Sequence, residues 1–89
     1  MIQMFMIVQV MGATIEEIER FHKILVQNGW FKYEGSQMTF FKFTDNESKK
    51  EINKEINADM NRTIKKLNLS CTVTVRFANQ QWIAFKNPN

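Results

Sequence analysis

The fold is decided by Met1–Met11, which reads MIQMFMIVQVM. The even positions of this segment are all apolar, whereas the odd positions mix Gln with Phe and Ile. Because side chains alternate across a strand, we expect the even series to face a helix layer and the odd series to face away from it. A strand that is apolar on both sides is typical of the centre of a sheet. The segment therefore predicts a central strand.

Helical and strand patterns alternate outward from this segment. Predicted helices cover Thr14–Asn28 and Glu47–Leu67, and predicted strand pairs cover Trp30–Phe43 and Ser70–Lys86. The first helix has an amphipathic stripe, and the second has a narrower one in which apolar residues recur every three or four positions. The clearest strand pattern is the alternation of apolar and polar residues within Ser70–Phe77.

The ends of these elements carry recognisable signals. Thr14 and Glu17 fit a capping box at the start of the first helix, and Asn28-Gly29 fits its end. Gly35-Ser36 is predicted as the turn of a hairpin that joins Trp30–Glu34 to Gln37–Phe43. The last strand pair turns within Ala78–Gln81 and ends in a short strand.

This order of elements predicts an α+β protein. We expect a ferredoxin-like β-α-β-β-α-β two-layer sandwich with an extra C-terminal strand, in which the first four strands take the order 4-1-3-2. Eighty-nine residues are enough for one core, so residues 1–89 are predicted to form a single domain. Both helices should cover one face of the sheet, and the other face should be open.

Strand parity divides the side chains between the helix layer and the open face. The predicted inward residues are apolar and comprise Met4, Met6, Val8, Phe31, Tyr33, Phe41, Phe43, Cys71, Val73, Val75 and Phe77. The open face is predicted to mix flat apolar groups with cations, and its candidate binding residues are Phe5, Ile7, Trp30, Lys32, Met38, Phe40, Lys42 and Arg76.

Three kinds of partner fit this arrangement. Aromatic, Met and Arg side chains are enriched at protein-docking surfaces, which favours a protein partner. Rings that stack on bases beside cations that meet phosphates would instead bind single-stranded nucleic acid. A homodimer could form through the edge of the final strand near Trp82 and Phe85. In a further alternative, the final strand or the tail folds over part of the open face and covers it.

One short segment resembles a known family. Met38–Phe43 is similar to the second half of the F/Y-G/A-F-V-x-F/Y signature of RNA-recognition motifs, and it departs from that signature at Ser36, Gln37 and Met38. Phe5 falls where that family often has a further aromatic residue. The resemblance implies that Phe5 and Phe40 are stacking rings and that Phe41 and Phe43 belong to the core.

Residues for catalysis or metal binding are sparse. The chain has one histidine, His22, and one cysteine, Cys71, and its three glycines are scattered rather than grouped in a phosphate-binding loop. We therefore predict no enzymatic activity, no metal and no cofactor. A net charge of +3 permits an acidic protein or a nucleic acid as partner without requiring either.

The sequence thus predicts a small non-enzymatic binding protein. No stretch has the length of about 18 apolar residues that a membrane helix needs, so we expect a cytoplasmic location and no membrane partner. Docking on a larger protein is the leading prediction. An inhibitor from a phage or another mobile element, of the anti-defence or anti-CRISPR type, would suit the size. The alternative is an RNA-binding module that uses the open face.

Overall fold

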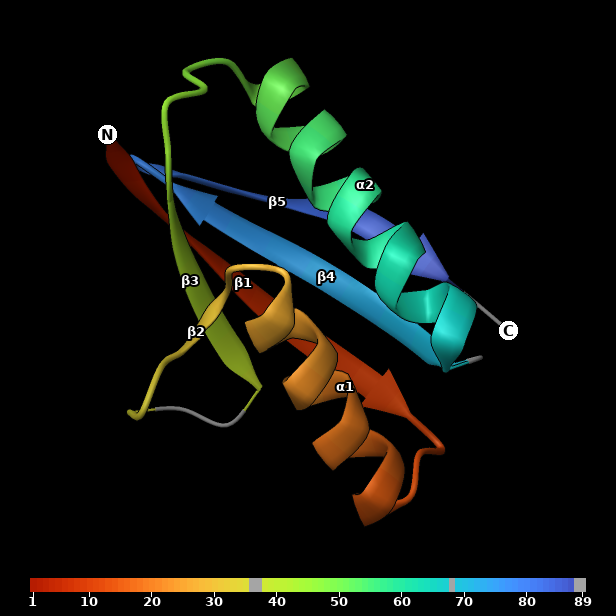
Figure 1. The fold of residues 1–89 in the computed structure, drawn as a ribbon. Coiled ribbons are helices and arrows are strands. Elements are labelled where there is room, and N and C mark those ends of the chain that lie inside the picture. Colours follow the sequence, from red (N-terminus) through yellow and green to blue (C-terminus); the bar gives the residue numbers. More distant parts are fainter. Residues whose placement is uncertain (36–37, 68, 88–89) are drawn as a thin grey trace.

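The computed structural model describes residues 1–35, 38–67 and 69–87, and within these it contains two helices and five strands (Figure 1). The elements in chain order are β1 (Ile2–Met11), α1 (Ile15–Gln27), β2 (Phe31–Lys32), β3 (Thr39–Thr44), α2 (Lys49–Lys66), β4 (Ser70–Phe77) and β5 (Gln80–Asn87). Each predicted helix and strand pair is present, although β2 is shorter and β5 longer than predicted. The predicted turn residue Ser36 and its neighbour Gln37 lie outside the described residues.

The strands form one antiparallel sheet in the order β2-β3-β1-β4-β5. The central strand is β1, as its apolar pattern predicted, and it pairs with β3 on one side and with β4 on the other. The last strand, β5, adds to the outer side of β4. An α+β fold with two helices and a five-stranded antiparallel sheet is thus confirmed for the described residues, and the ferredoxin-like assignment stays a prediction.

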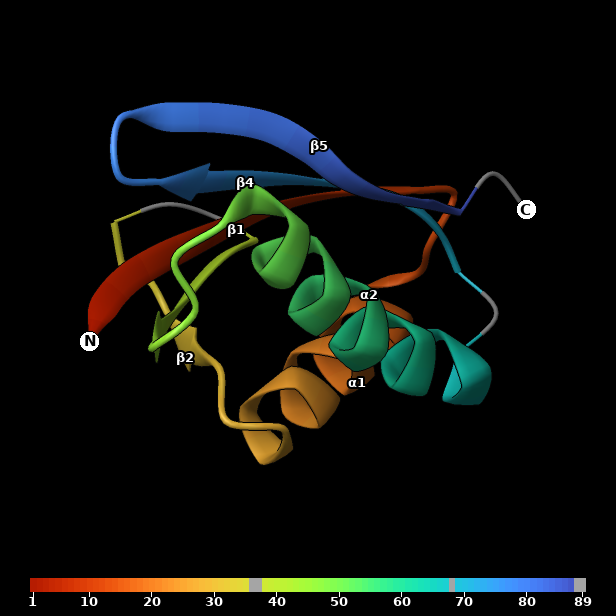
Figure 2. The ribbon, with the colours of Figure 1, turned by 90° about the horizontal axis from the view of Figure 1, so that it is seen from above.

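Both helices lie on the same side of the sheet, so the molecule has two layers (Figure 2). The core fills the space between these layers, where the even positions of β1 meet the apolar stripes of the helices. Its fully buried side chains include Met4, Met6, Phe21, Leu25, Trp30, Phe40, Ile52, Ile56, Met60, Val73 and Val75. We use "open face" for the side of the sheet that is turned away from the helices.

Local signals in the sequence explain where α1 begins and ends. The Thr14 amide donates to Glu17 Oε1 at 3.0 Å, and the Glu17 amide donates to Thr14 Oγ1 at 3.1 Å, which is the predicted capping box. Asn28 caps the other end, and Gly29 follows with a positive φ of 93°. That conformation suits glycine because it has no Cβ to clash.

The second helix is a surface helix with one buried stripe. Ser48 is its N-cap and accepts a hydrogen bond from the Glu51 amide at 3.2 Å. Ile52, Ile56 and Met60 are fully buried, as their spacing predicted. The polar residues Asp59 and Thr63 are buried beside this stripe, whereas most other polar side chains of α2 are exposed, so burial on one side is what holds this helix to the sheet.

The facing of β2 and β3 is the reverse of the prediction. Phe40 and Trp30, expected on the open face, have 0% and 1% of their surface exposed. The register explains this result, since Met6 lies opposite Phe40 and Phe5 lies opposite Phe41. Directly opposed residues in an antiparallel pair share a face of the sheet. Phe40 therefore joins Met6 in the core.

The same reversal moves four rings from the predicted core to the open face. Phe41 and Phe43 on β3, Phe31 on β2 and the following Tyr33 all lie there. The core roles that the resemblance implied for Phe41 and Phe43 are therefore wrong. Both series of β3 contain aromatic residues, so its alternation did not show which series is buried.

Candidate functional site

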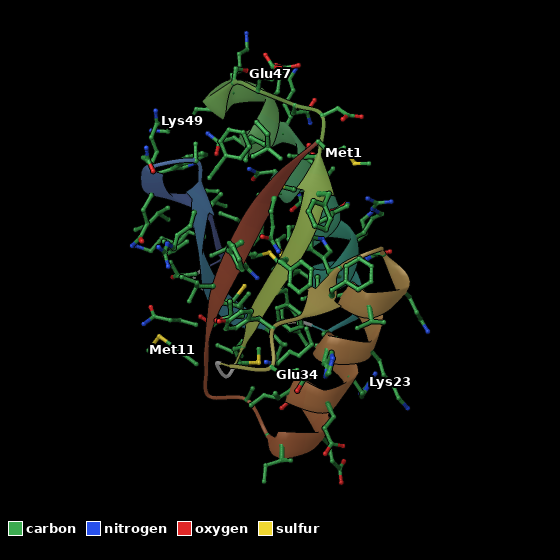
Figure 3. All side chains as sticks on the ribbon, turned by 90° about the vertical axis from the view of Figure 1, so that its left-hand side faces the viewer. Met1, Met11, Lys23, Glu34, Glu47 and Lys49 are labelled. Atoms are coloured by element: carbon green, nitrogen blue, oxygen red, sulfur yellow. The ribbon has the colours of Figure 1, made fainter. Side chains whose placement is uncertain are left out.

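The open face carries a cluster of five aromatic side chains, which we call the aromatic cluster. It consists of Phe5, Phe31, Tyr33, Phe41 and Phe43. Ring side chains gather over β1 and β3 between the labelled Met1 and Glu34 (Figure 3). The cluster therefore covers the half of the sheet formed by β2, β3 and β1.

Phe41 lies at the centre of the aromatic cluster. Its ring stacks on Phe31, with centroids 5.4 Å apart and planes inclined by 21°. It also contacts Phe43 at 6.3 Å and Phe5 at 6.1 Å. Phe5 in turn meets Tyr33 edge-on at 5.8 Å. These distances lie in the range in which aromatic pairs attract one another, so the rings form one continuous apolar surface.

Much of this surface is in contact with solvent. Phe31 is 57% exposed, Phe43 50% and Tyr33 42%, whereas Phe5 and Phe41 are half-buried between their neighbours. Large apolar side chains scattered singly on a surface are ordinary, but a contiguous group of them marks an interaction site. The aromatic cluster is therefore the candidate functional site.

Backbone pairing positions the cluster. The central pair of β1 and β3 places Phe5 opposite Phe41, and the short β2 places Phe31 opposite Phe41 from the other side. The Tyr33 amide donates to the Thr39 carbonyl at 2.8 Å, which holds the chain after β2 against β3. A Cβ added at Gly35 would lie 2.7 Å from the Tyr33 ring, so glycine leaves room for this ring.

Three predicted site residues lie on the open face, namely Phe5, Ile7 and Arg76. Phe5 is part of the aromatic cluster, and Arg76 on β4 lies directly opposite it in the register. Ile7 is half-buried between β3 and β4. The prediction of their facing is thus confirmed, and their role in binding stays a prediction.

The other predicted cations lie on the helix side of the sheet. Lys42 Nζ donates to Asp59 Oδ2 at 3.0 Å and lies 3.4 Å from Glu55 Oε2, both on α2. Lys32 shares a face with Phe40, and its Nζ lies 5.7 Å from the centre of that ring. The expectation that these two lysines line the open face is therefore wrong. Their strand positions have the parity of the buried series.

Met38 is also placed differently from the prediction. It has a positive φ of 55°, it packs partly against the core, and its carbonyl accepts a hydrogen bond from the Val8 amide at 3.0 Å. Its backbone therefore continues the pairing with β1 beyond the start of β3, and its side chain is not part of the aromatic cluster.

A buried polar cluster around Asp59 was not foreseen from the sequence. The Trp30 indole donates to Asp59 Oδ2 at 2.9 Å, and Arg62 on the next turn pairs with the other carboxylate oxygen. Lys42 completes the group and lies over the Trp30 ring at 5.3 Å. Asp59 directly precedes Met60 of the apolar stripe. This position at the border of the stripe was the one feature of the sequence that indicated its burial.

The predicted dimer edge belongs to β5, whose outer side pairs with no described strand. Trp82 and Phe85 lie opposite Val75 and Val73 and so face the helix layer. The Trp82 indole donates to Asn53 on α2 at 2.6 Å. Its side chain is thus engaged within the protein, and homodimerisation through the β5 backbone stays a prediction.

Other chemistry on the described residues is limited. Burial raises the pKa of the Cys71 thiol to about 11, so this group is protonated at neutral pH. Among the described residues, no three His, Cys, Asp or Glu side chains are grouped so that they could hold a metal ion. None of the described helices combines the length and the apolar character needed to cross a bilayer.

The chain matches no protein-family model, no curated protein and no solved structure.

Proposed function

We propose that this protein is a small non-enzymatic binding protein that docks on a larger protein through its aromatic cluster. The observation that carries the proposal is the exposure of Phe31, Phe43 and Tyr33 on the side of the sheet that has no described helix over it. Removing contiguous rings from water is the main favourable term in protein association. Rings of this kind are also the usual anchors of binding energy.

The charges around the cluster favour a protein partner over a nucleic acid. A surface for single strands combines stacking rings with a row of cations that follows the phosphates. Lys42, which was expected to supply such a cation, is paired with Asp59 and Glu55 in the helix layer. The cations at the described open-face positions of the sheet are Arg76 on β4 and Lys86 on β5, and Lys86 lies opposite Thr72 rather than beside the aromatic cluster.

The docking proposal is tested by capturing partners from extracts of the source cell with tagged protein. The double variant Phe31→Ser/Phe43→Ser removes the two most exposed rings of the cluster and leaves the core residues in place. We expect a protein captured by the wild type to be lost with this variant. A matched control, Ile15→Ser/Val26→Ser, removes exposed apolar side chains from α1 and should leave capture unchanged. Equal capture by all three proteins contradicts the proposal.

A second candidate function is binding of single-stranded nucleic acid, and it has one observation in its favour. Phe5 and Phe41 lie opposite each other on the central strands with Arg76 beside Phe5, so rings and a cation lie together. This candidate predicts that anisotropy of labelled single-stranded RNA rises at low salt and that Phe41→Ala costs roughly 1–3 kcal/mol of binding. Salt-independent binding, or none, excludes it.

The neighbour relations β4-β1-β3-β2 within the sheet support the ferredoxin-like assignment. The small size of the chain favours an inhibitor of a larger intracellular protein, of the kind that phages and other mobile elements carry. Capture of a defence protein in the experiment above would support that role, and capture of an unrelated partner would count against it.

A further inference from the structure

Arg76 is an exposed cation at the border of the aromatic cluster. It lies on β4 opposite Phe5, and its guanidinium has no hydrogen-bond or ion-pair partner among the described residues. Lys42 differs in this respect, since acidic side chains from α2 neutralise it. A guanidinium that is left without a carboxylate beside exposed rings is ready to pair with a group from outside.

Two hollows of the open face meet at Phe5 and Arg76. The smaller has a volume of about 200 Å³ and is lined by Phe5, Ile7, Tyr33, Thr39 and Arg76. The larger has a volume of about 450 Å³ and is lined by Ile2, Gln3, Phe5, Arg76 and Ala78. Both have mainly apolar walls, and the cation stands between them.

The neighbouring positions supply no negative charge. At the described open-face positions of β1, β3 and β4 there is no Asp or Glu, and the residues there are Gln3, Phe5, Ile7, Gln9, Met11, Thr39, Phe41, Phe43, Ser70, Thr72, Thr74 and Arg76. A second copy that docked through the same strands would therefore bring no carboxylate from these positions to Arg76. Charge complementarity favours a carboxylate from a partner of different sequence.

We propose that the partner presents an acidic side chain flanked by apolar ones, with its carboxylate paired to Arg76 and its apolar neighbours in the two hollows. This inference rests on the proposed docking function and specifies the chemistry of the partner. Arg binds carboxylates with two parallel hydrogen bonds, which fixes the orientation of the bound segment. The apolar neighbours supply the buried area, and the ion pair supplies the specificity.

The test selects short random peptides displayed on phage against the immobilised protein. We expect the enriched peptides to carry Asp or Glu next to aromatic or aliphatic residues. Synthetic copies should bind Arg76→Glu about tenfold more weakly or worse. Replacing the acidic residue of the peptide by Lys should restore binding to Arg76→Glu. The matched control Lys23→Glu reverses an exposed charge on α1 and should bind like the wild type.

The variants separate this inference from the docking proposal. Peptide binding that is lost in Phe43→Ser and unchanged in Arg76→Glu would overturn the role of the carboxylate and leave docking in place. Binding that is unchanged in both variants, or a selection that enriches no peptide, would overturn both proposals. Labelled oligothymidine that binds and displaces the peptides, with affinity lost in Arg76→Glu, would overturn the inference in favour of a nucleic acid. Circular dichroism confirms that each variant is folded.

Discussion

Asp59 shows how much a single buried carboxylate organises in this protein. A charge removed from water is costly unless hydrogen-bond donors and opposite charges surround it. Asp59 receives the Trp30 indole and the Lys42 ammonium on one oxygen and Arg62 on the other. These groups come from the chain before β2, from β3 and from α2. The carboxylate therefore joins the β2–β3 end of the sheet to the second helix.

Replacing Asp59 by Asn should lower the free energy of unfolding by roughly 2–4 kcal/mol. The physical reason is that Lys42 would keep its partly buried position while losing the nearer of its two counter-charges. Urea unfolding followed by tryptophan fluorescence measures the change. The matched control Asp45→Asn removes an exposed carboxylate and should change the value by less than about 1 kcal/mol. Equal effects of the two variants would show that the buried Asp59 carboxylate contributes no more to stability than an exposed one.

The Cys71 thiol predicts a dependence of stability on alkaline pH. Burial raises its pKa from an ordinary value of about 9 to about 11, so the folded protein keeps a proton that the unfolded chain releases. Its contribution to stability should be complete below pH 9 and should decline as the pH rises from about 9 to about 11. Comparing the pH profiles of wild type and Cys71→Ala by urea unfolding isolates this contribution. Parallel profiles would contradict it.

At the scale of elements, the facing of β3 decides which aromatic side chains are buried and which are exposed. Its two faces hold Phe41 and Phe43 on one side and Phe40 and Lys42 on the other. Hydrophobicity alone favoured the first pair as core because it contains no charge. The second pair is buried because α2 supplies Asp59 and Glu55 to the Lys42 ammonium, and because Phe40 packs against Phe21 of α1 with centroids 6.4 Å apart.

Alanine substitutions on the two faces of β3 should destabilise the protein by different amounts. Phe40→Ala should cost about 3–5 kcal/mol of stability because it opens a cavity in the core. Phe41→Ala should cost about 1 kcal/mol or less, since it removes half-exposed cross-strand contacts, and it should impair partner binding. Thermal unfolding measures both effects. A larger loss for Phe41→Ala would contradict the observed facing of the strand.

At the scale of the whole molecule, the two faces of the sheet differ, because the helices cover only one of them. The helices enclose one face of the sheet, and the aromatic cluster occupies part of the other. This asymmetry follows from the right-handed connections between the strands, which place both helices on the same side. The contiguous rings of the aromatic cluster are therefore exposed to solvent, and a partner can reach them without unfolding any element.

The exposed cluster should bind a hydrophobic dye in the native state. We expect anilinonaphthalene sulfonate to fluoresce with the wild type and to lose most of this signal with Phe31→Ser/Phe43→Ser, because these are the two most exposed rings of the contiguous aromatic cluster. The melting temperature of the variant should stay within a few degrees of that of the wild type. An unchanged dye signal would place the accessible apolar surface elsewhere on the molecule.

The amino-acid sequence by itself determined the elements of this protein. The capping box at Thr14, the glycine stop at Gly29 and the period-two pattern of Met1–Met11 depend on neighbours in the chain, so they can be recognised without a structure. The inward facing of β1 and β4 was also predictable, because in each strand one series is uniformly apolar.

Only the tertiary structure decided which face of β3 is buried and therefore where the candidate site lies. A strand with aromatic residues on both faces can satisfy hydrophobic burial in either orientation. The choice depends on its register against β1 and on the carboxylates that α2 brings to Lys42, residues that are distant in the sequence. Such contacts form only when the layers pack. For that reason Phe5 and Arg76 were placed correctly from the sequence, whereas Phe41 and Phe43 were found only in the folded chain.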